Sequence, residues 1–190
     1  QTGTLEFSSL TNSISNSGVG ESFSTTALIL LFSGLAFKLS LAPFHIWTPD
    51  VYEGSPLPST IYLATTGKAV IFVVLLRIVV STEALSLQSV TNAVVLVACV
   101  SIILGNLLAL LQKNIKRILS YSSIAHMGYL LIALLASLDS EGTISTETIT
   151  IYLVAYIIMS VGAFGVASVY SSSDAELDNV EDYRGLFWRD

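Results

Sequence analysis

Two lysines, Lys38 and Lys68, are the residues of this chain best suited to chemistry, because each lies within a long apolar run. Burial in a medium of low dielectric disfavours the charged form of an amine, so a lysine in such a place can take up and release a proton near neutral pH. Two such amines on adjacent helices would influence each other's protonation and could pass a proton between them. The alternative is that each ammonium forms a static ion pair that holds helices together, and the residue types leave both open.

The depth of these amines in a membrane follows from the polar stretch between them, residues 48–56, which we interpret as a turn at a membrane surface. Lys38 precedes Trp47 by nine residues, and Lys68 follows Pro56 by twelve. At about 1.5 Å per helical residue, both amines would lie roughly 14–18 Å below the same surface. That depth is close to the middle of a bilayer. A lysine there is costly, which predicts a functional role.

Two histidines are candidate proton relays. His126 lies within a later apolar run, and Ser122 and Ser123 precede it at helical spacing. Hydroxyls and an imidazole on one helix can support a chain of waters, although hydrogen-bonded helix packing explains the same residues equally well. His45 follows Pro43 near the end of the first apolar run, where it could control how protons reach Lys38. A histidine that merely lies at the membrane interface is the alternative.

Membrane-spanning helices are the elements that must position these side chains. Of the 190 residues, 53% are hydrophobic and only 12% are charged, and the mean hydropathy is +0.74, whereas about a quarter of the residues in soluble domains are charged. We therefore predict an all-α, polytopic membrane protein with about five spans, each long enough for a bilayer. The spans are expected near residues 25–47, 57–80, 90–111, 115–138 and 148–170.

The two ends of the chain are more polar than the spans. Residues 1–24 are predicted to form a polar loop outside the membrane, and residues 171–190 an inner-side loop that leads to a further helix. Because the chain begins at Gln1 without an initiator Met and without the features of a signal peptide, we interpret it as an internal fragment of a longer protein.

Basic residues between the spans and near their ends predict the orientation. Arg77 lies on one side of the predicted membrane. The side that carries the 48–56 turn holds the others, Lys113, Lys116, Arg117, Arg184 and Arg189. Since basic residues gather on the cytoplasmic side of bacterial membranes, or the matrix side of mitochondrial ones, the turn is expected there.

No sequence motif for a nucleotide, a metal or a redox cofactor is present. A phosphate loop, C-x-x-C, H-E-x-x-H and a Ser/His/Asp arrangement are all absent. The single cysteine, Cys99, allows no disulfide framework. None of the 14 acidic residues falls within a predicted span, so Lys38 and Lys68 must find partners in another helix, another subunit or water. We expect no cofactor or metal in this chain, and no nucleic-acid partner.

Three stretches resemble the antiporter-like membrane subunits of respiratory complex I: FKLSLAPFHIWTPDVYEGSPLPSTIYLATTGK, QKNIKRILSYSSIAHMGYLL and YRGLFWR. Within that family, TPDVYEG, the lysine of LATTGK and YRGLFW are most similar to the N subunits of bacterial NADH:quinone oxidoreductases and their mitochondrial counterparts. The resemblance implies a bundle of about fourteen helices with inverted repeats, of which this chain would supply helices seven to eleven.

What the resemblance implies about function is redox-driven proton translocation. Lys38 would match the lysine of a discontinuous helix, and Lys68 the lysine of the next helix. A partner glutamate would precede Gln1, and a further lysine would follow Asp190. Tyr152 stands, with Tyr156, on a helix face where sister subunits have histidines, which argues against an identical relay on that helix.

The resemblance also implies the setting of the chain. It would be a translocase subunit without a redox centre, while NADH, FMN, iron–sulfur clusters and quinone would be bound elsewhere in the parent complex. Its partners would be other complex I membrane subunits, the lipid bilayer and protons, in a bacterial inner membrane or the mitochondrial inner membrane. Two alternatives stay open: a cation/proton antiporter or membrane-bound hydrogenase subunit of the same superfamily, and a non-transporting structural membrane subunit in which the lysines tie helices together.

Overall fold

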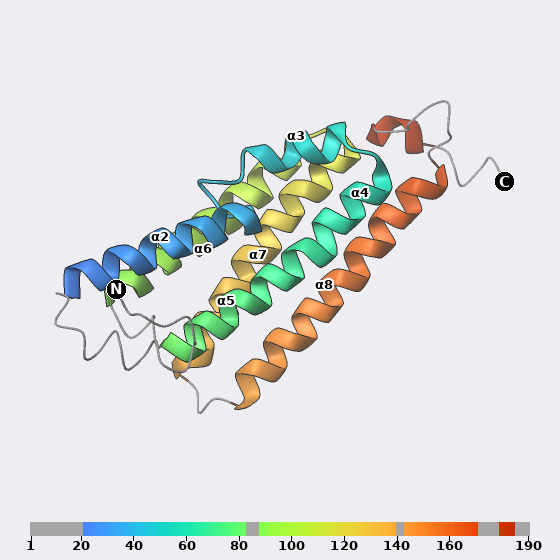
Figure 1. Ribbon diagram of the computed structural model, residues 1–190. Coiled ribbons are helices and arrows are strands. Elements are labelled where there is room, and N and C mark those ends of the chain that lie inside the picture. The colour runs from blue at the N-terminus through green and yellow to red at the C-terminus, as the bar shows by residue number, and fades with distance from the viewer. Residues whose placement is uncertain (1–20, 83–87, 140–142, 171–178, 185–190) are drawn as a thin grey trace.

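The computed structural model describes residues 21–82, 88–139, 143–170 and 179–184, and within these ranges it contains helices and no named strand. The helices run side by side as a bundle (Figure 1). They are α2 (Glu21–Leu39), α3 (Trp47–Gly54), α4 (Leu57–Tyr62), the π turn η1 (Leu63–Gly67), α5 (Lys68–Thr82), α6 (Gln88–Leu110), α7 (Ile115–Asp139), α8 (Thr143–Tyr170) and the 3₁₀ turn η3 (Val180–Tyr183). The predicted all-α class is confirmed.

Four helical segments are long and apolar enough to cross a membrane, each with 23 or 24 residues. They are Leu57–Val80, Gln88–Leu110, Ile115–Ser137 and Glu147–Tyr170, and a shorter apolar helix covers Thr25–Leu39. About 20 apolar residues suffice for a bilayer. This set agrees with the predicted polytopic membrane protein. Residues 1–20 and most of 171–190, predicted as loops, lie outside the described residues, and 21–24 already belong to α2.

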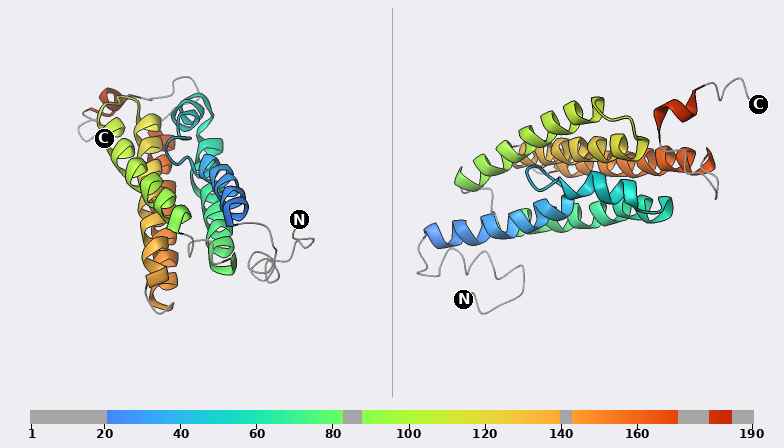
Figure 2. Two further views of the ribbon diagram at one scale, coloured as in Figure 1. Left: turned by 90° about the vertical axis from the view of Figure 1, so that its left-hand side faces the viewer. Right: turned by 90° about the horizontal axis from the view of Figure 1, so that it is seen from above.

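The bundle has two groups of helices, with α6, α7 and α8 on one side and α2 to α5 on the other (Figure 2). Within the first group, α6 and α7 approach each other most closely at two glycines. A methyl group on Gly105 would lie 2.8 Å from the Ala125 nitrogen, and one on Gly128 would lie 2.8 Å from Cγ1 of Ile102. Small residues of this kind let two membrane helices pack backbone to backbone.

The first predicted span, 25–47, differs from the structure because α2 ends at Leu39. Ser40 has a positive φ of 63°. Its amide donates to the Phe37 carbonyl at 3.1 Å, and the amide of Leu41 donates to the Ala36 carbonyl at 2.9 Å. These two bonds form a Schellman motif, which ends a helix, with serine in the place that glycine usually takes. The helix is therefore broken, as the resemblance implies for the helix of Lys38, whereas the sequence pattern predicted one continuous span over residues 25–47.

The predicted turn at 48–56 is also different, because most of it forms α3. Thr48, Pro49 and Asp50 occupy the first turn of that helix. Proline is tolerated there because its missing N–H would have no partner anyway, and an acidic side chain interacts well with the positive end of the helix dipole. The same residue types mark turns, which is why the sequence was interpreted as one. We refer to residues 40–46, between α2 and α3, as the helix break.

The π turn η1 keeps one face of the second span buried. Thr60, Ala64, Lys68 and Phe72 are all buried and follow each other at intervals of four residues. On a regular α-helix each interval of four drifts by about 40°, so three intervals would drift by about 120°. The extra residue that a π turn accommodates takes up about 100° of this drift. The four side chains therefore share one face.

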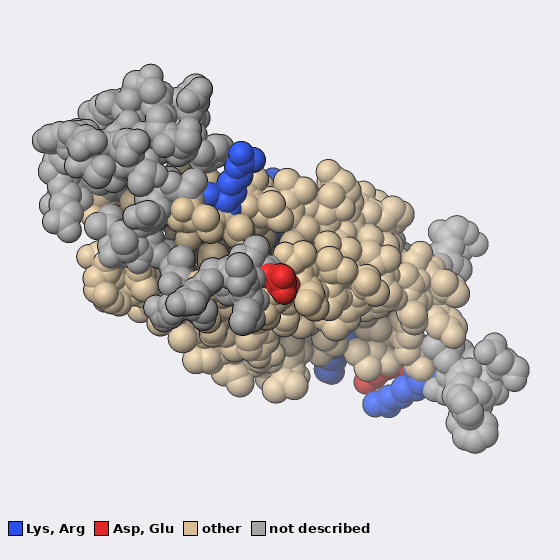
Figure 3. Space-filling model, turned by 90° about the horizontal axis from the view of Figure 1, so that it is seen from below, with Lys and Arg blue, Asp and Glu red and all other residues tan. Residues whose placement is uncertain are grey.

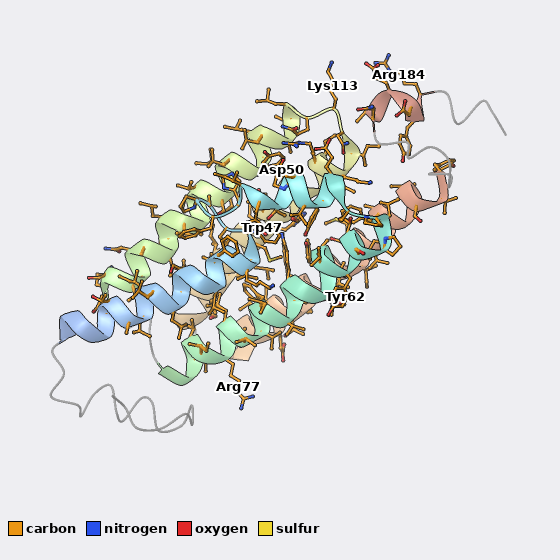
Figure 4. The ribbon with its side chains drawn as sticks, turned by 45° about the horizontal axis from the view of Figure 1, so that its top comes forward. Trp47, Asp50, Tyr62, Arg77, Lys113 and Arg184 are labelled. Carbon is orange, nitrogen blue, oxygen red and sulfur yellow. The ribbon has the colours of Figure 1, made fainter. Side chains whose placement is uncertain are left out.

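Charged groups lie mainly at the ends of the bundle, and one long face shows only small charged patches among uncharged atoms (Figure 3). Lys113 and Arg184 project from one end and Arg77 projects from the other (Figure 4). This arrangement agrees with the grouping of basic residues used for the predicted orientation. Arg189 lies outside the described residues.

Candidate functional site

Lys68 is enclosed by side chains from two other helices. It begins α5 and is 2% exposed. Its Nζ donates a hydrogen bond of 2.7 Å to Oγ of Ser123 on α7, and that hydroxyl donates to the Ser120 carbonyl at 2.7 Å. The same Nζ lies 5.7 Å from the ring centroid of Tyr52 on α3, a distance at which an ammonium is attracted to an aromatic face. We call Lys68, Ser123 and Tyr52 the Lys68 pocket.

The Lys68 pocket contains no ion pair to a carboxylate among the residues that the structure describes. It lies at the junction of two apolar clusters, one that includes Phe72 and one that includes Ala64 and Tyr52. An amine in such surroundings loses much of its hydration, and a single hydroxyl replaces little of it. This arrangement suits a group that exchanges a proton better than one that is permanently charged.

His126 on α7 faces two tyrosines of α8. Its Nδ1 and the hydroxyl of Tyr152 are hydrogen-bonded at 2.8 Å, with the donor set by the imidazole tautomer. The ring centroid of Tyr156 lies 5.5 Å from that of the imidazole. The Tyr156 hydroxyl donates to the Ala64 carbonyl in the π turn at 2.8 Å. The imidazole on α7 therefore lies directly against the tyrosine face of α8.

A cavity of about 120 Å³ lies between α7, α8 and the π turn. Its lining residues are Ala64, Leu119, Ser122, Ser123, His126, Tyr156, Met159, Ser160, Ala163 and Phe164. A single water needs about 10–15 Å³ by such a measure, so there is room for several waters, with hydroxyls and an imidazole to bind them. Because Ser123 belongs to both the cavity and the Lys68 pocket, water in the cavity would reach the hydrogen-bond partner of Lys68.

Lys38 has different surroundings from Lys68. It lies in the last turn of α2, directly before the helix break, and its side chain is exposed on this chain. In the described part of the chain no hydrogen bond or ion pair involves it, and it belongs to neither the cavity nor the Lys68 pocket. The structure therefore brings together Lys68 and His126 of the predicted residues, but not Lys38.

The helix break itself gathers buried polar atoms. His45 is 8% exposed and lies within the break. Its Nδ1 has no hydrogen-bond partner among the described residues, and neither has Oγ of Ser40 in the same break nor Oγ1 of Thr48 in the adjoining first turn of α3. The amide of Ala42 donates to Oγ of Ser101 on α6 at 2.9 Å, which ties the break to that helix. Buried polar atoms normally have partners, so this region is suited to bind water or a polar group from outside the chain.

Arg117, at the start of α7, connects that helix to α3. Its Nη1 bonds Asp50 at 2.9 Å and Glu53 at 2.7 Å, and the side-chain Nδ2 of Asn114 donates to Glu53 at 3.3 Å. Such partly exposed ion pairs contribute modestly to stability. They nevertheless join α3, which carries Tyr52, to the helix that carries Ser123. No group of three or more His, Cys, Asp or Glu side chains that could hold a metal occurs among the described residues.

Sequence reasoning missed three contacts of this site. Tyr52 was assigned to a turn, and neither Ser123 nor Tyr156 was identified as a partner of the second span. Ser123 is separated from Lys68 by 55 residues, and local patterns carry no information about such pairs. No local signal marked the π turn, because the four-residue interval from Thr60 to Phe72 lies in which side chains are buried and not in their residue types.

Comparison with known proteins gives one family. The model of the family described as "NADH:quinone oxidoreductase/Mrp antiporter, TM" matches residues 1–190. Subunit N of the NADH-quinone oxidoreductase of Methylococcus capsulatus is 51% identical over 162 residues, which cover 85% of this chain and 33% of that protein. The chain thus spans about a third of the length of this relative.

Two solved structures have a similar fold. A chain of respiratory complex I from Thermus thermophilus, determined with bound aureothin, matches with a TM-score of 0.72 and 39% identity. The match covers 92% of this chain and 36% of that one. A chain of the membrane-bound sulfane sulfur reductase, an archaeal respiratory membrane complex, matches with a TM-score of 0.77 over 92% of this chain and 35% of its own length. At 21% identity the second likeness concerns the fold alone.

Proposed function

The chain belongs to the NADH:quinone oxidoreductase/Mrp antiporter transmembrane family, and we propose that it forms part of a proton-translocating subunit of an NADH:quinone oxidoreductase. In this proposal Lys68 takes up and releases the transported proton. The observation that carries it is the burial of Lys68 against a hydroxyl, beside a polar cavity, with no bonded carboxylate in the described ranges. A permanently charged amine there would be costly, so proton exchange is favoured.

The proton path that we propose follows the polar groups around the cavity. A proton from Lys68 passes to Ser123 or to water in the cavity, and from there to His126. The hydrogen bond between His126 and Tyr152 extends the path to α8. Lys38 and His45, at the helix break, would serve the other half of the path, with the partner of Lys38 supplied from outside this chain.

The energy for transport would come from redox chemistry elsewhere in the complex. NADH oxidation and quinone reduction would take place in other subunits, which bind FMN, iron–sulfur clusters and quinone. The similarity to subunit N and to a chain of respiratory complex I supports this setting. The partners of the chain would then be other membrane subunits of the complex, in a bacterial or mitochondrial inner membrane.

The experiment that tests this proposal replaces Lys68 by alanine in the full-length subunit within its complex. We expect the K68A complex to assemble but to lose proton pumping by at least about tenfold, because the exchanging group is gone. Pumping is measured in inside-out membrane vesicles supplied with NADH and quinone. The matched control is K113A, which removes an exposed lysine at the end of the bundle (Figure 4). Normal pumping by an assembled K68A complex would refute the proposal.

Two other outcomes correspond to other functions. Failed assembly of K68A, with normal pumping by whatever complex forms, would indicate a structural subunit in which Lys68 ties helices together. Because the family description also includes Mrp antiporters, cation/proton exchange is the second candidate. Purification of the native complex separates the two, since only an NADH:quinone oxidoreductase co-purifies with a peripheral arm that oxidises NADH.

A further inference from the structure

The π turn directly before Lys68 depends on a contact from another helix. The amide of Lys68 donates to the Thr65 carbonyl rather than to the Ala64 carbonyl, which would be its α-helical acceptor. The Ala64 carbonyl accepts instead from the hydroxyl of Tyr156 on α8, at 2.8 Å. Ala64 is fully buried and Tyr156 is 2% exposed. Without the Tyr156 hydroxyl, the buried Ala64 carbonyl in the π turn would lose this hydrogen-bond donor, which is unfavourable.

The π turn also determines where Lys68 points. Single π turns are uncommon in α-helices, and they persist only where their surroundings hold them. If the turn relaxed to a regular α-helix, the direction of Lys68 relative to Thr60 would change by about 100°. Such a rotation would carry Nζ of Lys68 away from Oγ of Ser123, its hydrogen-bond partner. The Lys68 pocket therefore exists only while the π turn does.

From these contacts we propose that Tyr156 is a positioning residue: by donating to the Ala64 carbonyl, its hydroxyl holds the π turn and thereby keeps Lys68 against Ser123. The inference deepens the proposed function and rests on it. It assigns to Tyr156 a role other than the proton relay proposed for Tyr152, because the Tyr156 hydroxyl bonds the backbone of the second span. Tyr52, His126 and Tyr156 are the titratable side chains that α3, α7 and α8 contribute around this turn and Lys68.

The alternative is that Tyr156 acts only through its ring, which belongs to the larger apolar cluster. Tyr156→Phe distinguishes the two, because it keeps the ring and removes the hydroxyl alone. If packing were the whole role, Y156F would behave as the parent protein does. If the hydroxyl holds the turn, Y156F shifts the balance from the π turn toward the α turn without opening a cavity.

The experiment measures Y156F in the full-length subunit within its complex. We expect proton pumping at neutral pH to fall by about two- to tenfold, which corresponds to one lost hydrogen bond. We also expect the pH profile of pumping to shift, because Lys68 titrates in new surroundings, whereas a general loss of active complex would lower pumping equally at all pH values. The matched control is Y62F on the preceding α4, because Tyr62 is 62% exposed and lies outside the Lys68 pocket (Figure 4).

Hydrogen exchange adds a readout that does not depend on transport. In Y156F, and not in Y62F, the backbone amides of residues 64–68 should exchange faster with deuterium. Unchanged exchange and an unchanged pH profile would overturn the inference. A Y156F complex that fails to assemble would assign the hydroxyl to folding and would overturn it too.

The two proposals fail in different ways. If K68A pumps normally, the proposed function is wrong, whatever Y156F does. If K68A loses pumping while Y156F matches Y62F in rate, pH profile and exchange, only the role of Tyr156 is wrong.

Discussion

The surroundings of Lys38 and of Lys68 differ although both lysines adjoin an irregular piece of backbone. Lys38 lies in the last turn of a helix that ends in a Schellman motif and breaks, whereas Lys68 follows a π turn inside a helix that continues. Lys68 finds a hydroxyl and an aromatic face within this chain, while Lys38 is exposed on it. The difference teaches that this chain supplies contacts to Lys68 but, among its described residues, no hydrogen bond or ion pair to Lys38.

The strongest test of this difference replaces each lysine by methionine in the full-length subunit. Under the proposed function, both variants lose at least about tenfold of their pumping. Only K68M should raise the thermal stability of the complex, since it replaces a buried amine by an apolar side chain of similar length, and such exchanges are often neutral or stabilising. Differential scanning fluorimetry measures this. Equal stability changes in K38M and K68M would remove the distinction between the two sites.

A second prediction disturbs the helix pair on which both lysine regions rest. Gly128→Val places a branched side chain where even a methyl group would lie 2.8 Å from Ile102. Overpacking of this kind costs about 1–3 kcal/mol, so the midpoint of thermal unfolding should fall. The control is G162V, because nothing lies within 4 Å of a methyl group at Gly162. Similar midpoints for both variants would show that the close approach of α6 and α7 is not required.

A third prediction compares the two serines that hold the lysine regions. Ser123→Ala removes the hydroxyl bonded to Lys68, and Ser101→Ala removes the acceptor of the Ala42 amide in the helix break. Loss of one such bond costs about 0.5–1.5 kcal/mol, so under the proposed function S123A should lower pumping about two- to tenfold. S101A should instead lower thermal stability and affect pumping less. The opposite pattern would place the exchanging amine at the break.

The smallest expected effect concerns the connection between α3 and α7. Arg117→Gln removes the charge that bonds Asp50 and Glu53. Partly exposed ion pairs contribute about 0–1 kcal/mol, so R117Q should lower the unfolding midpoint slightly, and less so at high salt. K113Q, which removes an exposed charge at the same end, should show no such salt dependence. A large loss of stability in R117Q would mean that α3 is held mainly by this contact.

The apolar residues on both sides of Lys68 were enough to predict that it lies buried in a helix, because helix formation and hydropathy depend on neighbouring residues in the sequence. The sequence pattern by itself did not predict the helix break, which only the resemblance implied, because Pro43 and the Thr48–Asp50 segment carry residue types that serve helix starts and turns alike. The exposure of Lys38 could not be predicted from the surrounding sequence. In a helix that is apolar all round, residue types do not indicate which face packs against the rest of the chain. The approach of Ser123 to Lys68 depends on packing between distant segments.

The glycine contacts between α6 and α7 have a consequence for both lysine regions. The backbones of α6 and α7 approach each other closely at Gly105 and at Gly128. In this helix pair α6 carries Ser101 and α7 carries Ser123. The break beside Lys38 is hydrogen-bonded to α6, and the amine of Lys68 is hydrogen-bonded to α7, so both lysine regions are attached to the same closely packed pair of helices. A movement of α6 relative to α7 would therefore shift the two lysine regions relative to each other.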